Sequence, residues 1–156
     1  MASEENLTSG SVGDETAFVT LTIPCTPEYV GTARLTILGV ASRMGFSYDQ
    51  VEDIRLAVGE ACTNAIERAA VAGAVNPMIS IRSYIEPARL TVEVEDHASG
   101  PIGGGVDVKK PASNIEGMNS QELGALLMEI LVDEVTVEPA PGGGTRVRLV
   151  KFANES

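Results

Sequence analysis

The stretch VEDIRLAVGEACTNAIERAAV, residues 51–71, carries the hydrophobic repeat around which the rest of the chain is organised. Its apolar side chains recur every three or four residues, which is the spacing of one face of an α-helix. Ser47 and Gln50 precede the repeat at the spacing of a capping box, and Gly73 follows it as a helix stop. We therefore expect a helix that ends near Ala72 and buries a stripe made of Val51, Ile54, Val58, Ala61, Cys62, Ala65 and Ala69.

Two polar residues, Glu60 and Asn64, interrupt this helix one turn apart. Residues four apart on a helix share a face, so both side chains project in the same direction. An Asn carbonyl is an oxygen ligand that Mg²⁺ accepts, usually together with phosphate and water. A neighbouring carboxylate can accept a proton from an attacking hydroxyl or water, or orient it. Taken alone, such a pair is more often the polar rim of an amphipathic helix, so other features must decide.

The composition favours one folded domain with an aliphatic core. The chain has 156 residues, of which 44% are hydrophobic but only 4% are aromatic, and it contains no Trp. Eleven basic residues against 22 acidic ones give a net charge of −11. Such a chain repels polyanions and lacks the aromatic platforms of nucleic-acid binders, which argues against direct binding of nucleic acid. A basic protein partner suits this charge better.

Nothing in the sequence predicts a membrane segment or a disulfide framework. The first residues, MASEENLTSGSVGDE, are acidic and polar, unlike a signal peptide. No apolar run approaches the roughly 20 residues that span a bilayer. Cys25 and Cys62 lack metal-ligand spacing, and Cys62 falls on the apolar side of its helix, as expected of an inert buried thiol. We expect a reduced, cytoplasmic protein without membrane contact.

The remaining segments read as strands and helices in the order β-α-α-β-β-loop-α-β-β. Alternating apolar residues predict strands, and apolar residues at helical spacing predict a helix that begins after Thr26-Pro27 and a further helix beyond the loop. The order predicts a two-layer α/β sandwich, with helices on one face of a mainly antiparallel, mixed sheet. The expected strands are residues 16–24, 77–85, 89–96, 133–138 and 145–151, and the later helix is 123–131.

The same pass divides the chain into one domain and two tails. Residues 1–14 are polar and predict a disordered tail, 15–152 form a single domain, and 153–156 form a short C-terminal tail. Within the domain, residues 97–120 lose all periodicity and are rich in Gly, Pro, Ser and Asn. Long loops of this kind in a compact domain are usually functional lids or disordered.

Two glycine-containing segments add to the Glu60–Asn64 pair. Asp96 closes a strand and is followed by a turn, DHASG, that ends at Gly100. A carboxylate at a strand end can accept an N–H from a base such as the exocyclic amine of adenine, although a strand-ending Asp is more often a turn former. Gly124 stands at the mouth of a helix after the long loop, where helix N-termini attract phosphate.

Taken together and in this order, EACTNAIERA, DHASG, LGALLMEILVDEV and GGGTRVRLVK resemble the GHKL-type ATPase superfamily. More closely, the chain resembles the anti-sigma factor serine-protein kinases, the RsbW-like family, over roughly residues 16–152. The resemblance implies a Bergerat-type ATP-binding fold in which residues 97–120 are the ATP lid. It also implies ATP and Mg²⁺ as cofactors.

The resemblance assigns a role to each motif residue. Asn64 would hold Mg²⁺ and Glu60 would be the general base, while Asp96 would contact the adenine amine. Gly100 and Gly124 would border the nucleotide, and Thr145 would add a hydrogen bond on the adenine side.

The second glycine motif departs from the family pattern. It reads SQELG, with Ser120 where the family often has Arg and Glu122 where it has Gly. Phosphoryl transfer needs cationic groups around the transferred phosphoryl. Lys109 and Lys110 of the lid are candidate replacements, and ordinary solvated loop charges are the equally weighted reading.

Two further positions carry weaker expectations. Arg68 stands where the family often has His, and two orientations are open for its side chain, toward the nucleotide or only toward solvent, of which we expect the second. His97, the single His, is expected at the surface.

Three functional hypotheses follow. The resemblance implies a homodimeric kinase that sequesters a sigma factor and phosphorylates a Ser or Thr of a STAS-type anti-anti-sigma protein in a stress response. The departure in SQELG motivates the alternative, a catalytically weak anti-sigma module that switches partners. The third hypothesis is an α/β interaction domain without a ligand.

Overall fold

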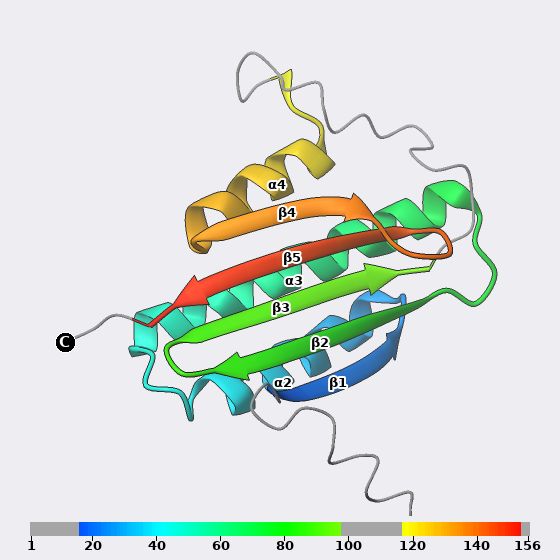
Figure 1. The fold of residues 1–156 in the computed structure, drawn as a ribbon. Helices are drawn as coiled ribbons and strands as arrows, with labels where there is room; N and C mark the ends of the chain where they lie inside the picture. Colours follow the sequence, from blue (N-terminus) through cyan, green and yellow to red (C-terminus); the bar gives the residue numbers. More distant parts are fainter. Residues whose placement is uncertain (1–15, 98–116, 154–156) are drawn as a thin grey trace, which may run out of the picture.

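The computed structural model describes residues 16–97 and 117–153. The expected disordered tail, most of the expected C-terminal tail and most of the expected lid lie outside these residues. Five strands form one sheet in the order β1-β2-β3-β5-β4, and all four pairings are antiparallel (Figure 1). The mixed sheet that we expected is therefore purely antiparallel in the described part. The strands are β1 (Ala17–Pro24), β2 (Met78–Glu86), β3 (Arg89–Asp96), β4 (Glu134–Pro139) and β5 (Thr145–Phe152).

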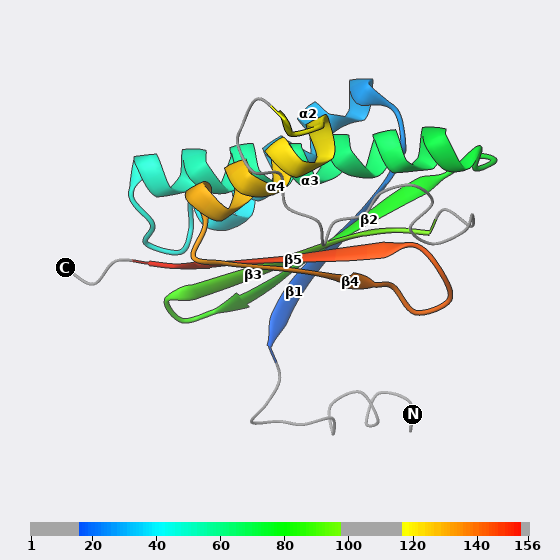
Figure 2. The ribbon, with the colours of Figure 1, turned by 90° about the horizontal axis from the view of Figure 1, so that it is seen from above.

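The helices cover a single face of this sheet. Figure 2 shows α2 (Val30–Ala41), α3 (Tyr48–Ala72) and α4 (Ser120–Leu131) on the same side, which confirms the two-layer α/β architecture. A short 3₁₀ turn, Pro27–Tyr29, leads into α2. Among the described residues, no helix is long and apolar enough to cross a membrane.

Helix α3 is the central element of the helical layer, and its ends follow the sequence signals. The Ser47 side chain accepts a hydrogen bond from the Gln50 amide, and the Gln50 side chain accepts one from the Ser47 amide, which completes the expected capping box. Gly73 ends the helix in the left-handed conformation at φ 68°. All seven residues of the expected stripe are buried, so the periodicity identified the face that packs on the sheet.

Helix α4 begins three residues earlier than the apolar pattern predicts. It starts at Ser120 because Asn119 and Glu122 form a second capping box, in which the Asn119 side chain accepts from the Glu122 amide at 2.8 Å. The Glu122 side chain accepts from the Asn119 amide at 3.1 Å in return. Ser120, which we placed in the lid, is therefore the first residue of α4, and the Glu122 carboxylate caps the N-terminus of the helix.

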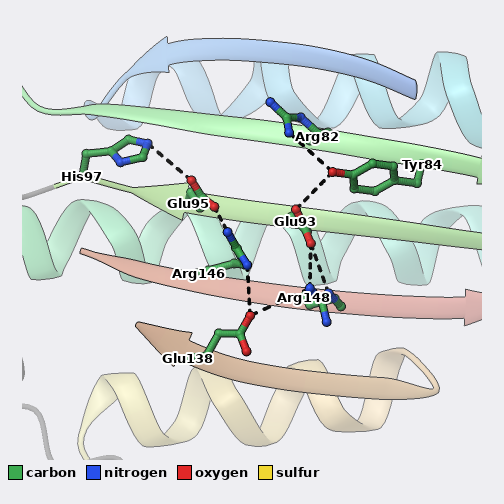
Figure 3. A network of polar contacts seen from close by, with 8 residues as sticks. All are labelled: Arg82, Tyr84, Glu93, Glu95, His97, Glu138, Arg146 and Arg148. Carbon is green, nitrogen blue, oxygen red and sulfur yellow. Dashed lines mark hydrogen bonds and ion pairs between the residues drawn. The ribbon is translucent and has the colours of Figure 1, made fainter. Parts of the chain in front are cut away.

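The opposite face of the sheet is open and carries a ladder of charged side chains, which we call the outer ladder (Figure 3). Successive residues of a strand point to opposite faces, so Glu93 and Glu95 lie on this face while Asp96 turns toward the helices. Arg146 pairs with Glu95, and Arg148 pairs with Glu93. The ladder comprises Arg82, Tyr84, Glu93, Glu95, His97, Glu138, Arg146 and Arg148.

The core between the two layers is aliphatic. The buried hydrophobic residues are Ile, Val, Leu, Ala, Met and Cys, without an aromatic side chain among those described. This agrees with the low aromatic content of the chain. The core packs α3 against the centre of the sheet and so fixes the depth at which Glu60 and Asn64 stand.

Candidate functional site

Glu60 and Asn64 project together from α3 toward α4. A β-carbon added to Gly124 would lie 2.7 Å from Asn64 Nδ2 and 3.0 Å from Glu60 Oε1. Both side chains therefore converge on one glycine of the neighbouring helix, as the four-residue spacing on α3 predicts. The Glu60–Asn64 pair and Gly124, which the sequence singled out separately from that pair, form a single cluster.

Gly124 occupies a different place from the one we predicted. It is the fifth residue of α4, not a residue at the mouth of the helix, and it is buried against α3. Because it lacks a side chain, α4 can lie directly over Asn64 and Glu60. The requirement for Gly at this position is thus one of close packing against polar side chains.

The amide of Asn64 stands out among the polar groups of this region. Only 4% of the residue is exposed, and both polar atoms of its side chain lie within 3.0 Å of the position that a β-carbon on Gly124 would take. Buried polar side chains need polar partners, which protein groups, ordered water or a bound ion supply. An oxygen-seeking cation beside the Asn64 carbonyl oxygen would satisfy this group.

The residues fit an Mg²⁺ ion that takes most of its ligands from elsewhere. No group of three or more His, Cys, Asp or Glu side chains suited to a metal occurs among the described residues. Mg²⁺ commonly uses one or two protein ligands together with phosphate oxygens and water. The Asn64 carbonyl, with the Glu60 carboxylate beside it, is a donor set of this kind.

Asp96 ends β3 at the helix-covered side of the sheet. The residue is 1% exposed, and its register partner on β5 is Thr145, so these two predicted site residues lie side by side. Gly144, which the sequence analysis did not single out, precedes Thr145 with φ +95°. A β-carbon there would collide with the Asp96 carbonyl oxygen, so the last glycine of the β4–β5 turn permits this close approach.

Arg68 does not face solvent, contrary to our expectation. Its guanidinium donates to Asp96 Oδ2 from Nη2 at 2.9 Å and from Nε at 3.2 Å. Helix α3 places Arg68 one turn after Asn64, on the side toward the end of β3. The ion pair compensates the cost of burying the Asp96 carboxylate.

A further cluster of hydrogen bonds joins the first turn of α4 to α3. Arg68 Nη1 donates to Gln121 Oε1, and Gln121 Nε2 donates to the Asn64 carbonyl and to Glu67 Oε1. Ser120 Oγ donates to the same Glu67 oxygen at 3.0 Å. We call Glu67, Arg68, Asp96, Ser120 and Gln121 the inner cluster. Gln121 gave no signal in the sequence, because its partners lie more than fifty residues away.

Both cysteine thiols stay protonated at neutral pH. Burial raises the pKa of Cys62 to about 12, which confirms the buried thiol that we expected. Burial also raises the pKa of Cys25, the nearby Asp96 carboxylate adds to the rise, and Arg68 opposes it.

The other expected site residues are placed as follows. Gly100, Lys109 and Lys110 lie outside the described residues. His97 is at the surface, as expected, with its Nε2 atom 3.5 Å from Glu95 Oε1 on the outer ladder (Figure 3).

Comparison with known proteins relates this arrangement to one family. Residues 23–151 match the family described as histidine kinase-like ATPase domain. The chain is 38% identical over 148 residues to the serine-protein kinase RsbW of Bacillus subtilis, covering 88% of this chain and 86% of that protein. It is 34% identical over 148 residues to the protein of the same name from Listeria innocua, with 88% of each chain covered.

A solved structure supports the fold. The structure of the RsbU and RsbW domains of a protein from Mycobacterium tuberculosis matches with a TM-score of 0.64 and 18% identity. The match covers 90% of this chain and 34% of that one. At this identity the similarity concerns the fold alone.

Proposed function

The chain belongs to the histidine kinase-like ATPase family, as a member of its RsbW-like serine-protein kinase group, and on this premise we propose that it is an anti-sigma factor kinase. In this proposal it binds Mg-ATP, sequesters a sigma factor and phosphorylates a Ser or Thr of a STAS-type anti-anti-sigma protein. The single observation that carries the ATP site is the convergence of the buried Asn64 amide and Glu60 Oε1 on Gly124.

Each residue of the site has a chemical task in this proposal. Asn64 would hold Mg²⁺ through its carbonyl oxygen, and the ion would supply positive charge to the phosphates. Glu60 accepts the proton of the Ser or Thr hydroxyl as the hydroxyl oxygen bonds to the γ-phosphorus and the bond from that phosphorus to ADP breaks. Asp96 accepts an N–H from the adenine amine, and Thr145, its neighbour across β3 and β5, adds a hydrogen bond on the same side.

The remaining assignments complete the site. Gly124 and Gly100 border the nucleotide, and Lys109 and Lys110 of the lid that precedes α4 supply positive charge toward the transferred phosphoryl group. The net charge of −11 attracts a basic transcription factor. In this proposal the protein acts as a homodimer in the cytoplasm, within a stress response.

A second candidate function has its own observation. Ser120 and Glu122 replace the Arg and Gly of the family motif, and both side chains are used locally, Ser120 on Glu67 and Glu122 in the helix cap. A chain without a cation at this point would bind its partners but transfer phosphate poorly. We keep this partner-switching module as the alternative.

An assay of phosphoryl transfer distinguishes the kinase from the partner-switching module. The chain is incubated with γ-labelled ATP, Mg²⁺ and a STAS-type protein that binds it, and label is followed on the acceptor. The proposal predicts transfer by the unaltered chain, and a loss of about a hundredfold or more in Glu60→Gln, because a positioned base contributes on this order. An acceptor that binds but receives no label under saturating Mg-ATP would contradict the kinase and favour the alternative.

A further inference from the structure

Helix α4 has the composition of a buried helix but is covered on one side only. From Leu123 to Leu131 its sequence, LGALLMEIL, contains a single charged residue, Glu129. A helix that is apolar all round is normally covered all round. In the structure, however, only Gly124 and Met128 of α4 are buried. Figure 1 shows α3 between α4 and α2, so the far side of α4 has no other described helix beside it.

The exposed apolar side chains of α4 form one row. Leu123, Leu127 and Ile130 are 46%, 39% and 70% exposed. Their spacing of four and three residues puts them on one side of the helix, and we call this row the α4 stripe. Val137 of β4, 42% exposed, adds to the apolar surface on the same face of the sheet, because its register partner Val147 lies in the core. A single exposed leucine is ordinary, but an aligned set marks a binding surface.

The α4 stripe lies in a region of negative charge. Residues 117–137 include no Lys, Arg or His, and their charged residues are Glu122, Glu129, Asp133 and Glu134. Glu129 and Glu134 are exposed and form no ion pair with a described residue. Lys151 reaches the end of α4, but its ammonium group donates to the Leu131 carbonyl and its side chain is only 14% exposed. The region therefore complements a cationic partner.

Charge also decides among the possible occupants of this face. Two copies of the chain that met through it would bring the same carboxylates together, which costs free energy. An anionic bilayer would be repelled, and helices that lie on membranes carry Lys and Arg beside their apolar row. A protein segment with leucines flanked by lysines or arginines would instead complement both the apolar row and the carboxylates.

The shape of the α4 stripe fits a helix as the occupant. The stripe extends over two turns of α4, or about 10 Å. An amphipathic helix offers apolar anchors at i, i+3 or i+4, and i+7 over the same length. A bound strand would need the open backbone groups of a sheet edge, which the side of a helix does not provide.

We propose that the α4 stripe is the docking site for a basic amphipathic helix of a partner protein. The inference rests on the proposed function for the existence of such a partner, and it names the surface and the chemistry that the partner must have. Leu123, Leu127 and Ile130 pack against the apolar anchors of the bound helix. Glu129 and Glu134 pair with the lysines or arginines beside those anchors.

The test uses a synthetic helical peptide of about 15 residues, with leucines at i, i+3, i+4 and i+7 and lysines on the flanks. Its binding to the full chain without nucleotide is measured by calorimetry and located by the shifts of backbone amide signals in NMR spectra. One control peptide has Glu in place of Lys, and another has the same residues in an order without an apolar face. We expect only the amphipathic lysine peptide to bind, with the amide shifts concentrated in α4.

Variants of the chain identify the face. Leu127→Gln combined with Ile130→Gln should weaken binding of the peptide by about tenfold or more, because a few apolar anchors dominate such affinities. Glu129→Gln combined with Glu134→Gln should weaken it by about threefold or more at low salt and remove most of its salt dependence. Leu35→Gln, which removes a leucine that is 64% exposed on α2, should bind as the unaltered chain does.

Other results would overturn the proposal. Absence of binding, or binding that the Leu127→Gln and Ile130→Gln pair leaves unchanged, would show that this face does not accept a basic helix. A dimer in sedimentation that the same pair of substitutions dissociates would make a second copy the occupant. Binding to vesicles of neutral or anionic lipid that the pair abolishes would make the face a membrane contact.

The outcome for this surface is independent of the outcome for the nucleotide site. If the chain binds the peptide at α4 but does not bind Mg-ATP, the proposed ATP site fails and the docking site stands. If the chain binds Mg-ATP but not the peptide, only the docking site fails.

Discussion

Glu95 and Asp96 are neighbours on β3, and each pairs with an arginine, but on opposite faces of the sheet. On the open face, Arg146 Nε lies 2.7 Å from Glu95 Oε2, and 22% and 19% of the two side chains are exposed (Figure 3). Under the helices, Arg68 Nη2 lies 2.9 Å from an Asp96 carboxylate that is almost fully buried. The two pairs have similar lengths and the same chemistry.

The difference between them is the solvent. Water and salt screen the outer ladder, so each of its pairs contributes little free energy. The inner cluster is screened less, and removing one partner leaves a costly uncompensated charge. A shift of one residue along β3 therefore separates an ion pair on the open face of the sheet from one buried between the sheet and the helices.

The largest difference in the free energy of unfolding should appear between the variants that remove the Asp96 and the Glu95 carboxylate. Asp96→Ala leaves the guanidinium of Arg68 with Gln121 alone and should lower the free energy of unfolding by about 2–3 kcal/mol, below the value for a fully buried pair because Arg68 is partly exposed. Glu95→Ala should cost about 1 kcal/mol or less. Urea denaturation of both variants measures this, and equal losses would refute the distinction between the two faces.

Gly124→Ala tests the packing of α4 over the Asn64 and Glu60 side chains. The added methyl group meets the ends of the Asn64 and Glu60 side chains, which can turn away, so the fold should survive. Displacing both groups should weaken binding of Mg-ATP by about tenfold or more, roughly 1.4 kcal/mol. Glu129→Ala, on the exposed side of the same helix, is the matched control. Unchanged binding of Mg-ATP by Gly124→Ala would show that α4 does not form part of the site.

Gln121→Ala removes bonds to Arg68, Glu67 and the Asn64 carbonyl. Each partner keeps another bond or gains water, so we expect a loss of about 1 kcal/mol in the free energy of unfolding. Amide hydrogen exchange should rise in the first turn of α4 and stay unchanged in β5. Exchange that rises in neither element would show that the cluster does not hold α4.

The smallest change in the free energy of unfolding should come from the outer ladder. Arg148→Met loses a pair with Glu93 at 2.9 Å, and 38% of the arginine side chain is exposed. The expected loss is about 0.5 kcal/mol, and it should vanish in 1 M salt because the pair is already screened there. Thermal denaturation at low and high salt provides the comparison, and a loss that persists at high salt would contradict it.

The buried thiol of Cys62 leads to a prediction about the stability of the fold at alkaline pH. Its pKa of about 12 lies above the ordinary value of 9, so the folded protein retains the proton that the unfolded chain releases. The contribution to stability is complete below pH 9 and is lost as the pH rises toward 12. Alkylation at pH 7.5 should spare Cys62 in the folded chain, and rapid labelling without unfolding would contradict this.

Local signals in the sequence account for the parts of this molecule that depend on neighbours along the chain. The spacing of Glu60 and Asn64 placed them on one helix face, and Ser47 with Gln50 fixed the start of α3. Asp96 lies at the end of β3, where the alternation of side chains along the strand directs it toward the helices.

What escaped prediction depends on contacts between distant segments. Arg68 and Asp96 are 28 residues apart, and no pattern within α3 distinguishes a paired arginine from a solvated one. Gly124 was assigned to the start of α4 because the apolar pattern begins at Leu123, whereas the Asn119–Glu122 capping box starts the helix earlier. Gln121 becomes part of the site only when α4 packs on α3.

The central claim is that the cluster of Glu60, Asn64 and Gly124 binds Mg-ATP, and a calorimetric titration of the unaltered chain and of Asn64→Ala tests it directly. The account predicts binding by the unaltered chain and none by the variant, while the variant without nucleotide keeps a cooperative thermal unfolding transition, so that the site is lost and not the fold. Equal binding by both proteins, or no binding by the unaltered chain, would contradict it.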